Sequence, residues 1–474
     1  MSEVKNLFKN SSWMMASQIV TGLFGFIWTI LTARYLGSND FGIMSFAMSF
    51  AGIIVILMDL GVSTYATRDM SRDNKLASDY LGKLIPLKIL LSITTIFISL
   101  IILFMMGKNS LTIIVTLIFV LEYALMSMSS LFQGGFQSFG KMEYQAKGII
   151  INSFLILAFI FITIYFKLGL IFLASAYCFS YVVMLMYLVI SSRKHIAIPN
   201  FKISPNFCKK AIKLAIPFAI TSLFTTIYFS IDMVMLSVIC GNVATGIYNA
   251  SYKIITVLIT FYGVYQTVVF PLMSKLFNGS EDLLKLSYSK SIKYLLLIIL
   301  PISLGIVLYA NPLVNLIYGN EYVLSGPVMQ ILVWTVIFCY INGAGTTLLN
   351  SSNKEVSVTK IYCIAAIFNF CLNLLLIPSF SYHGAALATV LSEIFICLLT
   401  IHVIRNTLYC PDKSIFKDIF KIILASVVMF VVLDFTGLNI WFGIIVGIIV
   451  YSVCILGFKT LDDKDKALVH DIIK

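Results

Sequence analysis

Long apolar runs separated by short polar links constrain this chain more than any other feature of its sequence. Fourteen stretches of about twenty mostly apolar residues follow one another from Trp13 to the region of Gly447. A helix of about twenty residues is long enough to cross the hydrocarbon core of a bilayer. Because 60% of the 474 residues are hydrophobic and only 11% are charged, these runs predict an all-α polytopic membrane protein with fourteen transmembrane helices.

The basic residues mark the two sides of the membrane. With the N-terminus inside, nearly all lysines and arginines of the links fall on one side, and the opposite links contain only Lys108 and Lys167. Cytoplasmic loops carry such an excess of Lys and Arg, so we expect both termini in the cytoplasm. The net charge of +12 is then a topology signal and does not indicate nucleic-acid binding. The nine cysteines form no CxxC pair, and we predict no metal and no cofactor.

A short glycine turn occurs twice in the chain, about two hundred residues apart. The first copy contains Gly37 and Gly42 between two apolar runs, and the second contains Gly241 and Gly246. An offset of 204 residues superimposes both glycines. The chain therefore has the form of two copies of one six-span unit. Because both copies start in the cytoplasm, we expect parallel repeats around an axis along the membrane normal.

The domain boundaries follow from this repeat. We expect an N-lobe of six spans at residues 1–191, a cytoplasmic linker at 192–213, a C-lobe of six spans at 214–410, and two further helices with a cytoplasmic tail at 411–474. Within the linker, Ser204-Pro205 has the form of an N-cap followed by proline at the first helical position, and it predicts a short helix on the membrane surface. No link is longer than about twenty residues, which leaves no room for a soluble catalytic domain.

Polar residues recur at helical spacing inside several spans. On one interpretation they line a polar passage, and on the other they form hydrogen bonds between helices. Because several spans share the pattern, a cavity between the two lobes is favoured. The residues that we expect to line it are Ser49, Asp59, Asp232, Tyr248, Asn249, Asn342, Asn369 and Asn373.

Charged residues inside the spans carry more weight, since each costs about 2.5–3.5 kcal/mol at the centre of a membrane helix. Arg34 either faces a cavity or snorkels to water. Lys253 and Asp232 lie at similar depth, and they form either a structural ion pair or a site where Lys253 meets an anionic substrate. Lys88 either snorkels to the cytoplasmic surface or faces the passage.

Two carboxylates, Glu122 and Glu393, lie near the middle of the membrane, one in each lobe. A proton carrier and a neutral, hydrogen-bonded acid both fit that position. The sequence contains no nucleotide-binding glycine loop, no GxSxG motif and no paired carboxylates on an outer loop. We therefore do not expect an enzyme.

Four motifs follow one another from the first span to the twelfth. They are Arg34-x-Leu36-Gly37-x3-Phe41-Gly42; Asp232-x2-Met235-Leu236 followed by Gly246-x-Tyr248-x-Ala250-x2-Lys253-Ile254; Leu316-x-Tyr318-Gly319-x2-Tyr322; and Asn369-x3-Asn373-x3-Ile377-Pro378 followed by Gly384-Ala385-Ala386 and Ser392-Glu393. In this order, on fourteen spans, the set resembles Wzx-type polysaccharide flippases. Their superfamily, called MATE/MOP, also holds the MATE drug antiporters and the lipid II flippase.

The resemblance implies two six-helix lobes around a central cavity that opens to each side in turn. It implies a flippase that moves an undecaprenyl-diphosphate-linked oligosaccharide repeat unit to the outer leaflet of a bacterial inner membrane, for O-antigen, capsule or a related glycan. Arg34, Lys253 and Lys88 are the candidate partners of the diphosphate. The implied molecular partners are this lipid-linked sugar, membrane lipids, a polysaccharide polymerase and a chain-length regulator.

Two other functions remain as alternatives at this point. An ion-coupled antiporter for small molecules would favour acidic cavity residues, whereas the charged candidates here lean towards cations. A membrane glycan polymerase or glycosyltransferase would need a large outer loop and an acidic catalytic pair, and the sequence shows neither.

Overall fold

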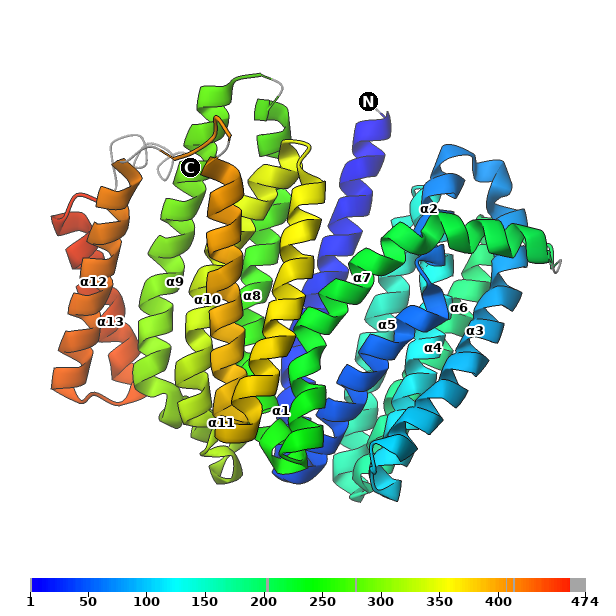
Figure 1. Ribbon diagram of the computed structural model, residues 1–474, viewed down its shortest axis with the longest axis horizontal. Helices are drawn as coiled ribbons and strands as arrows, with labels where there is room; N and C mark the ends of the chain where they lie inside the picture. The colour runs from blue at the N-terminus through cyan, green and yellow to red at the C-terminus, as the bar shows by residue number, and fades with distance from the viewer. Residues whose placement is uncertain (1, 202–203, 278, 406, 412–413, 461–474) are drawn as a thin grey trace. The chain divides into compact units, whose positions relative to one another are not determined.

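The computed structural model describes residues 2–201, 204–277, 279–405, 407–411 and 414–460, and within these ranges it contains helices and no strand (Figure 1). The predicted tail after residue 460 lies outside the described residues. The helices are α1 (Ser2–Asp59), α2 (Val62–Arg72), η1 (Asn74–Leu76), α3 (Ala77–Met105), α4 (Ser110–Ser138), α5 (Met142–Phe166), α6 (Gly169–His195), α7 (Pro205–Ile239), α8 (Asn242–Phe277), α9 (Glu281–Tyr318), η2 (Asn320–Tyr322), α10 (Ser325–Ser351), α11 (Glu355–Arg405), α12 (Ser414–Thr436) and α13 (Ile440–Gly457). The all-α fold class is confirmed.

Twelve helices of the described chain are long and apolar enough to cross a membrane. Two of them, in α1 and α11, each extend over 51 residues, which corresponds to about 75 Å and exceeds a hydrocarbon core of about 30 Å more than twofold. Both helices contain one residue with non-helical backbone angles, Gly37 in α1 and Ser381 in α11. Figure 1 shows α1 and α11 each turning back on itself. Two crossings in each of these helices would give the predicted fourteen spans, a number that stays a prediction.

The glycine turns of the two repeats have the same backbone conformation. Gly37 has a φ of 72° and Gly241, at the offset of 204, has a φ of 87°. Both angles lie in the left-handed region, which glycine adopts without steric cost. The chain can therefore reverse at these two positions, directly before the second helix of each repeat.

The two turns contact each other, backbone against backbone, and the contact is symmetric. A methyl group on Gly42 would lie 1.8 Å from the carbonyl oxygen of Asn242, and one on Gly246 would lie 2.0 Å from the carbonyl oxygen of Ser38. The repeat offset relates Ser38 to Asn242 and Gly42 to Gly246. Each copy therefore presents the same two positions to the other, as the partners of a two-fold symmetric dimer do.

The linker region differs from the expected short surface helix. Ser204 is the N-cap of α7 and Pro205 occupies its first turn, as predicted, but α7 then continues through Pro217 to Ile239. Its first half lies against the start of α2, because a methyl group on Gly61 would lie 2.6 Å from the carbonyl oxygen of Ala215. The expected surface helix is thus the first part of a longer one.

The chain forms two compact units, Met1–Asn249 and Ala250–Lys474, here called the first and second unit. The first unit contains α1 to α7 and the start of α8, so its boundary lies later than the predicted linker at 192–213. The reason lies in the contacts of α7 with α2 and of the second glycine turn with the first. The predicted lobes at 1–191 and 214–410 follow the sequence repeat, whereas the two units follow the contacts between residues.

The two helices beyond the repeat are fixed to the second unit through α9. Lys293 of α9, which is 3% exposed, forms an ion pair of 3.0 Å with Asp418 of α12. The Tyr451 hydroxyl of α13 donates a hydrogen bond to the Leu297 carbonyl oxygen, and the Tyr309 hydroxyl donates to the Leu438 carbonyl oxygen. Helices α12 and α13 are therefore tied to α9 at several points along its length.

Lys108, one of the two cations expected on the outer side, connects the α3–α4 link to α7. Its Nζ donates to the carbonyl oxygen and to the hydroxyl of Ser237, at 2.7 and 2.8 Å, and lies 4.5 Å from the centre of the Phe46 ring. Burial lowers the pKa of this amine to about 8. Both acceptors belong to the last turn of α7, and Phe46 belongs to α1. Lys108 therefore connects the α3–α4 link to α7 and to α1.

The symmetric contact predicts the effect of adding one methyl group. Gly42→Ala should lower the free energy of unfolding by about 2 kcal/mol or more, because the new carbon has no space beside the Asn242 carbonyl oxygen. Gly22→Ala is the matched control, since nothing lies within 4 Å of its added carbon and alanine favours a helix over glycine by about 1 kcal/mol. Thermal unfolding of both variants in detergent micelles measures the difference. Equal stability of the two variants would contradict the close contact.

Candidate functional site

A lysine inside the apolar region of the first unit is neutralised by its neighbours. Lys88 of α3 is fully buried, and its Nζ pairs with Asp59 at the end of α1. The same nitrogen donates to the Ser63 hydroxyl at 2.6 Å, and Ser63 in turn donates to the Asp59 carboxylate at 2.5 Å. Ser130 of α4 adds a hydrogen bond to Ser63 at 2.9 Å. The cluster joins α1, α2, α3 and α4.

This burial corrects one expectation for Lys88. The Lys88 side chain has no exposed surface, so it does not extend to water. Its positive charge is balanced by the Asp59 carboxylate, and the pair as a whole has no net charge with which to attract an anion. We therefore leave Lys88 out of the proposed diphosphate site. Asp59 is 23% exposed, so it has one side in the cluster and one side open.

Predicted cavity residues of the first unit gather next to the glycine contact. The Tyr248 hydroxyl donates to Asp232 Oδ2 at 2.9 Å, and both residues are buried. Asn249 Nδ2 donates to the Ser45 hydroxyl at 2.5 Å, across the repeat offset of 204. Ser49 is partly exposed, one helical turn beyond Ser45. At Ser45 and Asn249 the polar stripes thus form an interhelical hydrogen bond.

The two remaining candidate cations differ in their surroundings. Arg34 lies in α1, three residues before the non-helical Gly37, and its side chain is exposed. Lys253 lies in α8, in the second unit, and is partly exposed. Lys253 forms no hydrogen bond or ion pair with the described part of the chain. An ammonium group in a membrane helix needs an anionic or aqueous partner, which keeps Lys253 a candidate.

The asparagines of the second unit form a buried network between α10 and α11. Asn342 Nδ2 donates to Glu393 Oε2 at 2.8 Å and to the Glu393 carbonyl oxygen at 2.9 Å. Asn369 donates to the Ser392 hydroxyl at 3.1 Å, and Asn373 donates to Asn369 at 3.0 Å. All five side chains are at most 5% exposed. The network ties the two halves of α11 to each other and to α10.

The second mid-membrane carboxylate has a different environment. Glu122 of α4 is 5% exposed, and its Oε2 finds no hydrogen-bond partner among the described residues. A buried polar atom without a partner is costly. Of the two carboxylates, Glu393 fits the interpretation of a hydrogen-bonded acid, and Glu122 keeps the features expected of a proton carrier.

A polar cleft of about 760 Å³ lies where α8, α10 and α11 approach one another in the second unit. Its lining combines amides, a hydroxyl and a carboxylate with one aromatic ring and a proline. The lining residues are Gln266, Thr267, Phe270, Pro271, Asn350, Asn353 and Glu355. Such a mixture is suited to sugars, whose hydroxyl groups pair with amides and whose apolar faces lie on aromatic rings.

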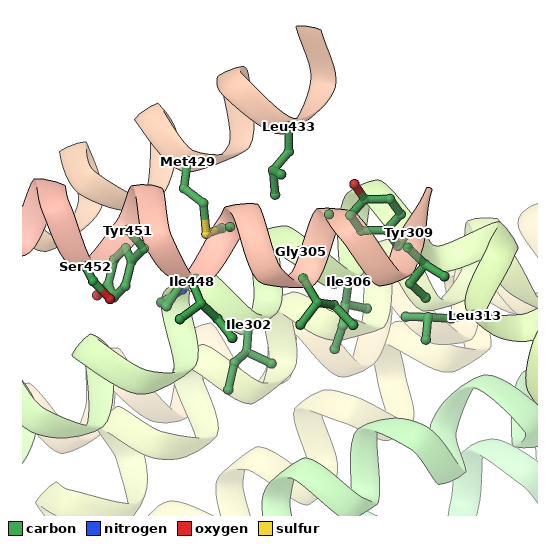
Figure 2. Close-up of a pocket in the computed structure, with 15 residues that line it drawn as sticks. Ile302, Gly305, Ile306, Tyr309, Leu313, Met429, Leu433, Ile448, Tyr451 and Ser452 are labelled. Atoms are coloured by element: carbon green, nitrogen blue, oxygen red, sulfur yellow. The ribbon is translucent and has the colours of Figure 1, made fainter. Parts of the chain in front are cut away.

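A second cavity of the same unit is almost entirely apolar. It has a volume of about 380 Å³ and lies between α9, α12 and α13. Figure 2 shows Ile302 and Ile306 of α9, Met429 of α12 and Ile448 of α13 converging on this space. Gly305, Gly443 and Gly447 leave room along its walls. No charged residue belongs to the described lining, so the cavity suits a hydrocarbon chain.

Sequence reasoning missed several of these residues. Ser63 and Ser130 complete the Lys88 cluster, and only Ser63 had a local signal, its spacing of four residues from Asp59. Gln266 of α8 and Asn353 of the α10–α11 link also line the polar cleft. Gln266 does not belong to the polar stripe of its span and Asn353 lies outside a helix, so no helical spacing marked them. Asn350, by contrast, follows Asn342 and Thr346 at steps of four residues, a helical spacing that the sequence shows.

The chain matches two protein-family models. The model described as "Polysaccharide biosynthesis protein" matches residues 7–277, and the MatE model matches residues 217–375. Among curated relatives, the capsular polysaccharide biosynthesis protein CapF of Staphylococcus aureus is 24% identical, over 83% of this chain and 98% of that protein.

Solved structures with the same fold are membrane transporters. The lipid II flippase MurJ in an inward closed conformation aligns with a TM-score of 0.79 at 17% identity, covering 97% of this chain and 99% of that one. An inward-facing multidrug transporter of the MATE family aligns with a TM-score of 0.66 at 15% identity, covering 81% and 94%. At these identities the likeness concerns the fold.

The buried cluster predicts that Lys88 and Asp59 depend on each other. Asp59→Asn alone leaves the buried ammonium without a counter-charge, and it should lower the stability by about 3 kcal/mol or more. The double variant Asp59→Asn, Lys88→Met removes both charges and should recover most of that loss. Thermal unfolding in detergent measures both. Additive effects of the two substitutions would contradict the pairing, because independent sites add.

Proposed function

The chain belongs to the polysaccharide biosynthesis protein family of the MATE/MOP superfamily, and on this premise we propose that it is a flippase for an undecaprenyl-diphosphate-linked oligosaccharide repeat unit. The observation that carries the proposal is the family match over residues 7–277, more than half of the chain. The substrate would move from the cytoplasmic to the outer leaflet as the protein opens to each side in turn.

The cavities of the second unit support an amphiphilic substrate. A lipid-linked sugar carries hydroxyl-rich rings at one end and a long hydrocarbon chain at the other. The polar cleft of about 760 Å³ offers amide and hydroxyl groups, and the apolar cavity of about 380 Å³ offers a surface without charge. A transporter for small soluble molecules has no use for the second surface.

The diphosphate requires cations. Arg34 and Lys253 are the residues that we propose for it, since Lys253 is a membrane-embedded ammonium without a partner in the described chain and Arg34 is exposed near the turn of α1. A guanidinium group binds phosphate oxygens through two parallel hydrogen bonds. Asp59, Ser49 and the Asp232–Tyr248 pair are proposed to line the same passage.

The cellular setting forms part of the proposal. We place the chain in a bacterial inner membrane with both termini in the cytoplasm, in accord with its lysine and arginine distribution. Its product would serve a polymerase and a chain-length regulator that assemble O-antigen, capsule or a related glycan. The name of the relative CapF supports a capsule. The MatE match at residues 217–375 favours a small-molecule antiporter as the second candidate.

Transport into inverted membrane vesicles tests the proposed substrate and its cations. A diphosphate-linked oligosaccharide in the outer leaflet of the vesicle becomes protected from an added glycosidase when it is flipped. We expect protection with the wild type and at least a tenfold slower rate with Arg34→Ala or Lys253→Ala, because the diphosphate loses a counter-charge. Arg72→Ala and Lys275→Ala, which remove cations from the last turns of α2 and α8, should transport normally.

The outcomes of this assay separate the candidates. Normal transport by Arg34→Ala and Lys253→Ala would make these cations structural. A wild type that protects no lipid-linked sugar but expels a cationic dye would establish the antiporter instead.

Proton coupling through the two carboxylates has its own test. Glu122→Gln and Glu393→Gln remove the exchangeable proton and keep the shape of the side chain. If either residue carries the coupling proton, its variant should lose the acceleration of transport by a pH gradient. Glu281→Gln, in the exposed first turn of α9, is the control. An unchanged response in both variants would refute proton coupling at these residues.

A further inference from the structure

An apolar groove lies on the first unit, and its described lining includes none of the residues proposed for transport. It has a volume of about 430 Å³ and is lined by α3, α4, α6 and residues 199–201. Several lining side chains are well exposed, among them Ile89 at 48%, Ile93 at 62% and Leu121 at 46%. The groove therefore opens to the exterior of the first unit, where a membrane helix meets lipid.

The length of the groove corresponds to one leaflet. On α3 its lining extends from Ile85 to Ile96, a rise of about 16 Å at 1.5 Å per residue. Half of the hydrocarbon core of a bilayer is about 15 Å. On α3 the groove begins at Ile85, two residues after the charged Lys83, and ends at Ile96, about halfway along the apolar stretch that reaches Met105. An acyl chain of one leaflet matches this extent.

One wall of the groove is the segment after α6, and this wall is fixed. The Ser78 hydroxyl donates to the Ile198 carbonyl oxygen at 2.6 Å, and the backbone N–H of Asn200 donates to the Ser78 carbonyl oxygen at 3.1 Å. Gly82 leaves the space for this contact, since a methyl group there would lie 1.9 Å from the Asn200 carbonyl oxygen. Pro199 and Phe201 are thus held against α3 as part of the fold.

A single charged residue belongs to the described lining. Arg193 lies in the last turn of α6 beside Lys194. Its side chain is exposed and forms no hydrogen bond or ion pair within the part of the chain that the structure describes. A guanidinium group presents a fork of donors that fits phosphate oxygens. The groove thus has a hydrocarbon-like floor and a phosphate-binding group at its basic end.

We propose that this groove binds one anionic phospholipid of the leaflet on the basic side of the membrane. Its phosphate pairs with Arg193, and one acyl chain lies along α3 between α4 and α6. The positive charges of Arg193 and Lys194 favour a headgroup with net negative charge over a zwitterionic one. This site does not depend on which molecule the protein transports.

The shape of the groove argues against a protein occupant. A helix is about 10–12 Å wide with its side chains, and one that crossed the membrane would continue for about 14 Å beyond the end of a 16 Å groove. That remainder of about 14 Å of a partner helix would have no groove to pack into. A single flexible chain fills such a space without this mismatch.

Titration with phosphatidylglycerol tests the proposal. The purified full-length protein in detergent is titrated with this lipid, and bound lipid is counted by native mass spectrometry. We expect one tightly held molecule and a tenfold weaker affinity in Arg193→Gln, about 1.4 kcal/mol. Lys194→Gln removes the same charge from the neighbouring position, which does not line the groove, and should change the affinity less than twofold. Equal losses in the two variants would overturn the site, since they indicate general attraction to a basic surface.

A second pair of variants tests the position of the acyl chain. Ser92→Phe fills the groove from within, and Leu90→Phe adds bulk at a lipid-facing position of the same helix that is 62% exposed. Ser92→Phe should lose the tightly held lipid while Leu90→Phe keeps it, both with unchanged thermal unfolding after delipidation. Lipid binding by Ser92→Phe at wild-type affinity would refute the groove as the site. A dimer mass that Ser92→Phe converts to a monomer would identify a second copy of the chain as the occupant.

Discussion

The backbone contact between the two glycine turns is the constraint on which the first unit depends. At Gly42 and Gly246 there is space for hydrogen and not for a methyl group, so the second helix of each repeat approaches the other at a fixed point. Because the contact is symmetric, the same packing of a glycine against a carbonyl oxygen occurs twice, once from each copy of the repeat. It also sets the register of the neighbouring side chains: Asn249 meets Ser45 across the offset of 204, and Tyr248 turns to Asp232.

Polar groups within the membrane helices are satisfied mostly by one another. Hydrocarbon offers no hydrogen bonds, so an unpaired group is costly there. Lys88 is paired with Asp59 and two serines, and Asn342 is bonded to Glu393. These contacts hold helices together. Among the charged candidates, Lys253 and one oxygen of Glu122 lack such partners in the described chain, so they carry more of the functional argument.

The cavities differ in chemistry and hence in the ligand that each can hold. The cleft at the ends of α8, α10 and α11 is polar, the space between α9, α12 and α13 has no described charge, and the groove on the first unit has one arginine at its end. The proposed ligands follow this difference: a sugar for the cleft, a hydrocarbon chain for the apolar space and a phospholipid for the groove. The family match supports the first two as parts of one proposed substrate, and the bilayer itself supplies the third.

The sequence by itself determined the fold class, the two-copy organisation and the family. Each rests on a one-dimensional pattern: apolar runs as long as a bilayer is thick, glycines repeated at one offset, and four motifs in order. Tertiary structure alone decided which polar residues form hydrogen bonds between helices and where the cavities lie. The partner of Lys88 lies 29 residues away and that of Asn342 lies 51 residues away, and periodicity along one helix says nothing about which neighbouring helix its polar face will meet. Cavities arise from the fit of several helices at once, so no single stretch of sequence encodes them.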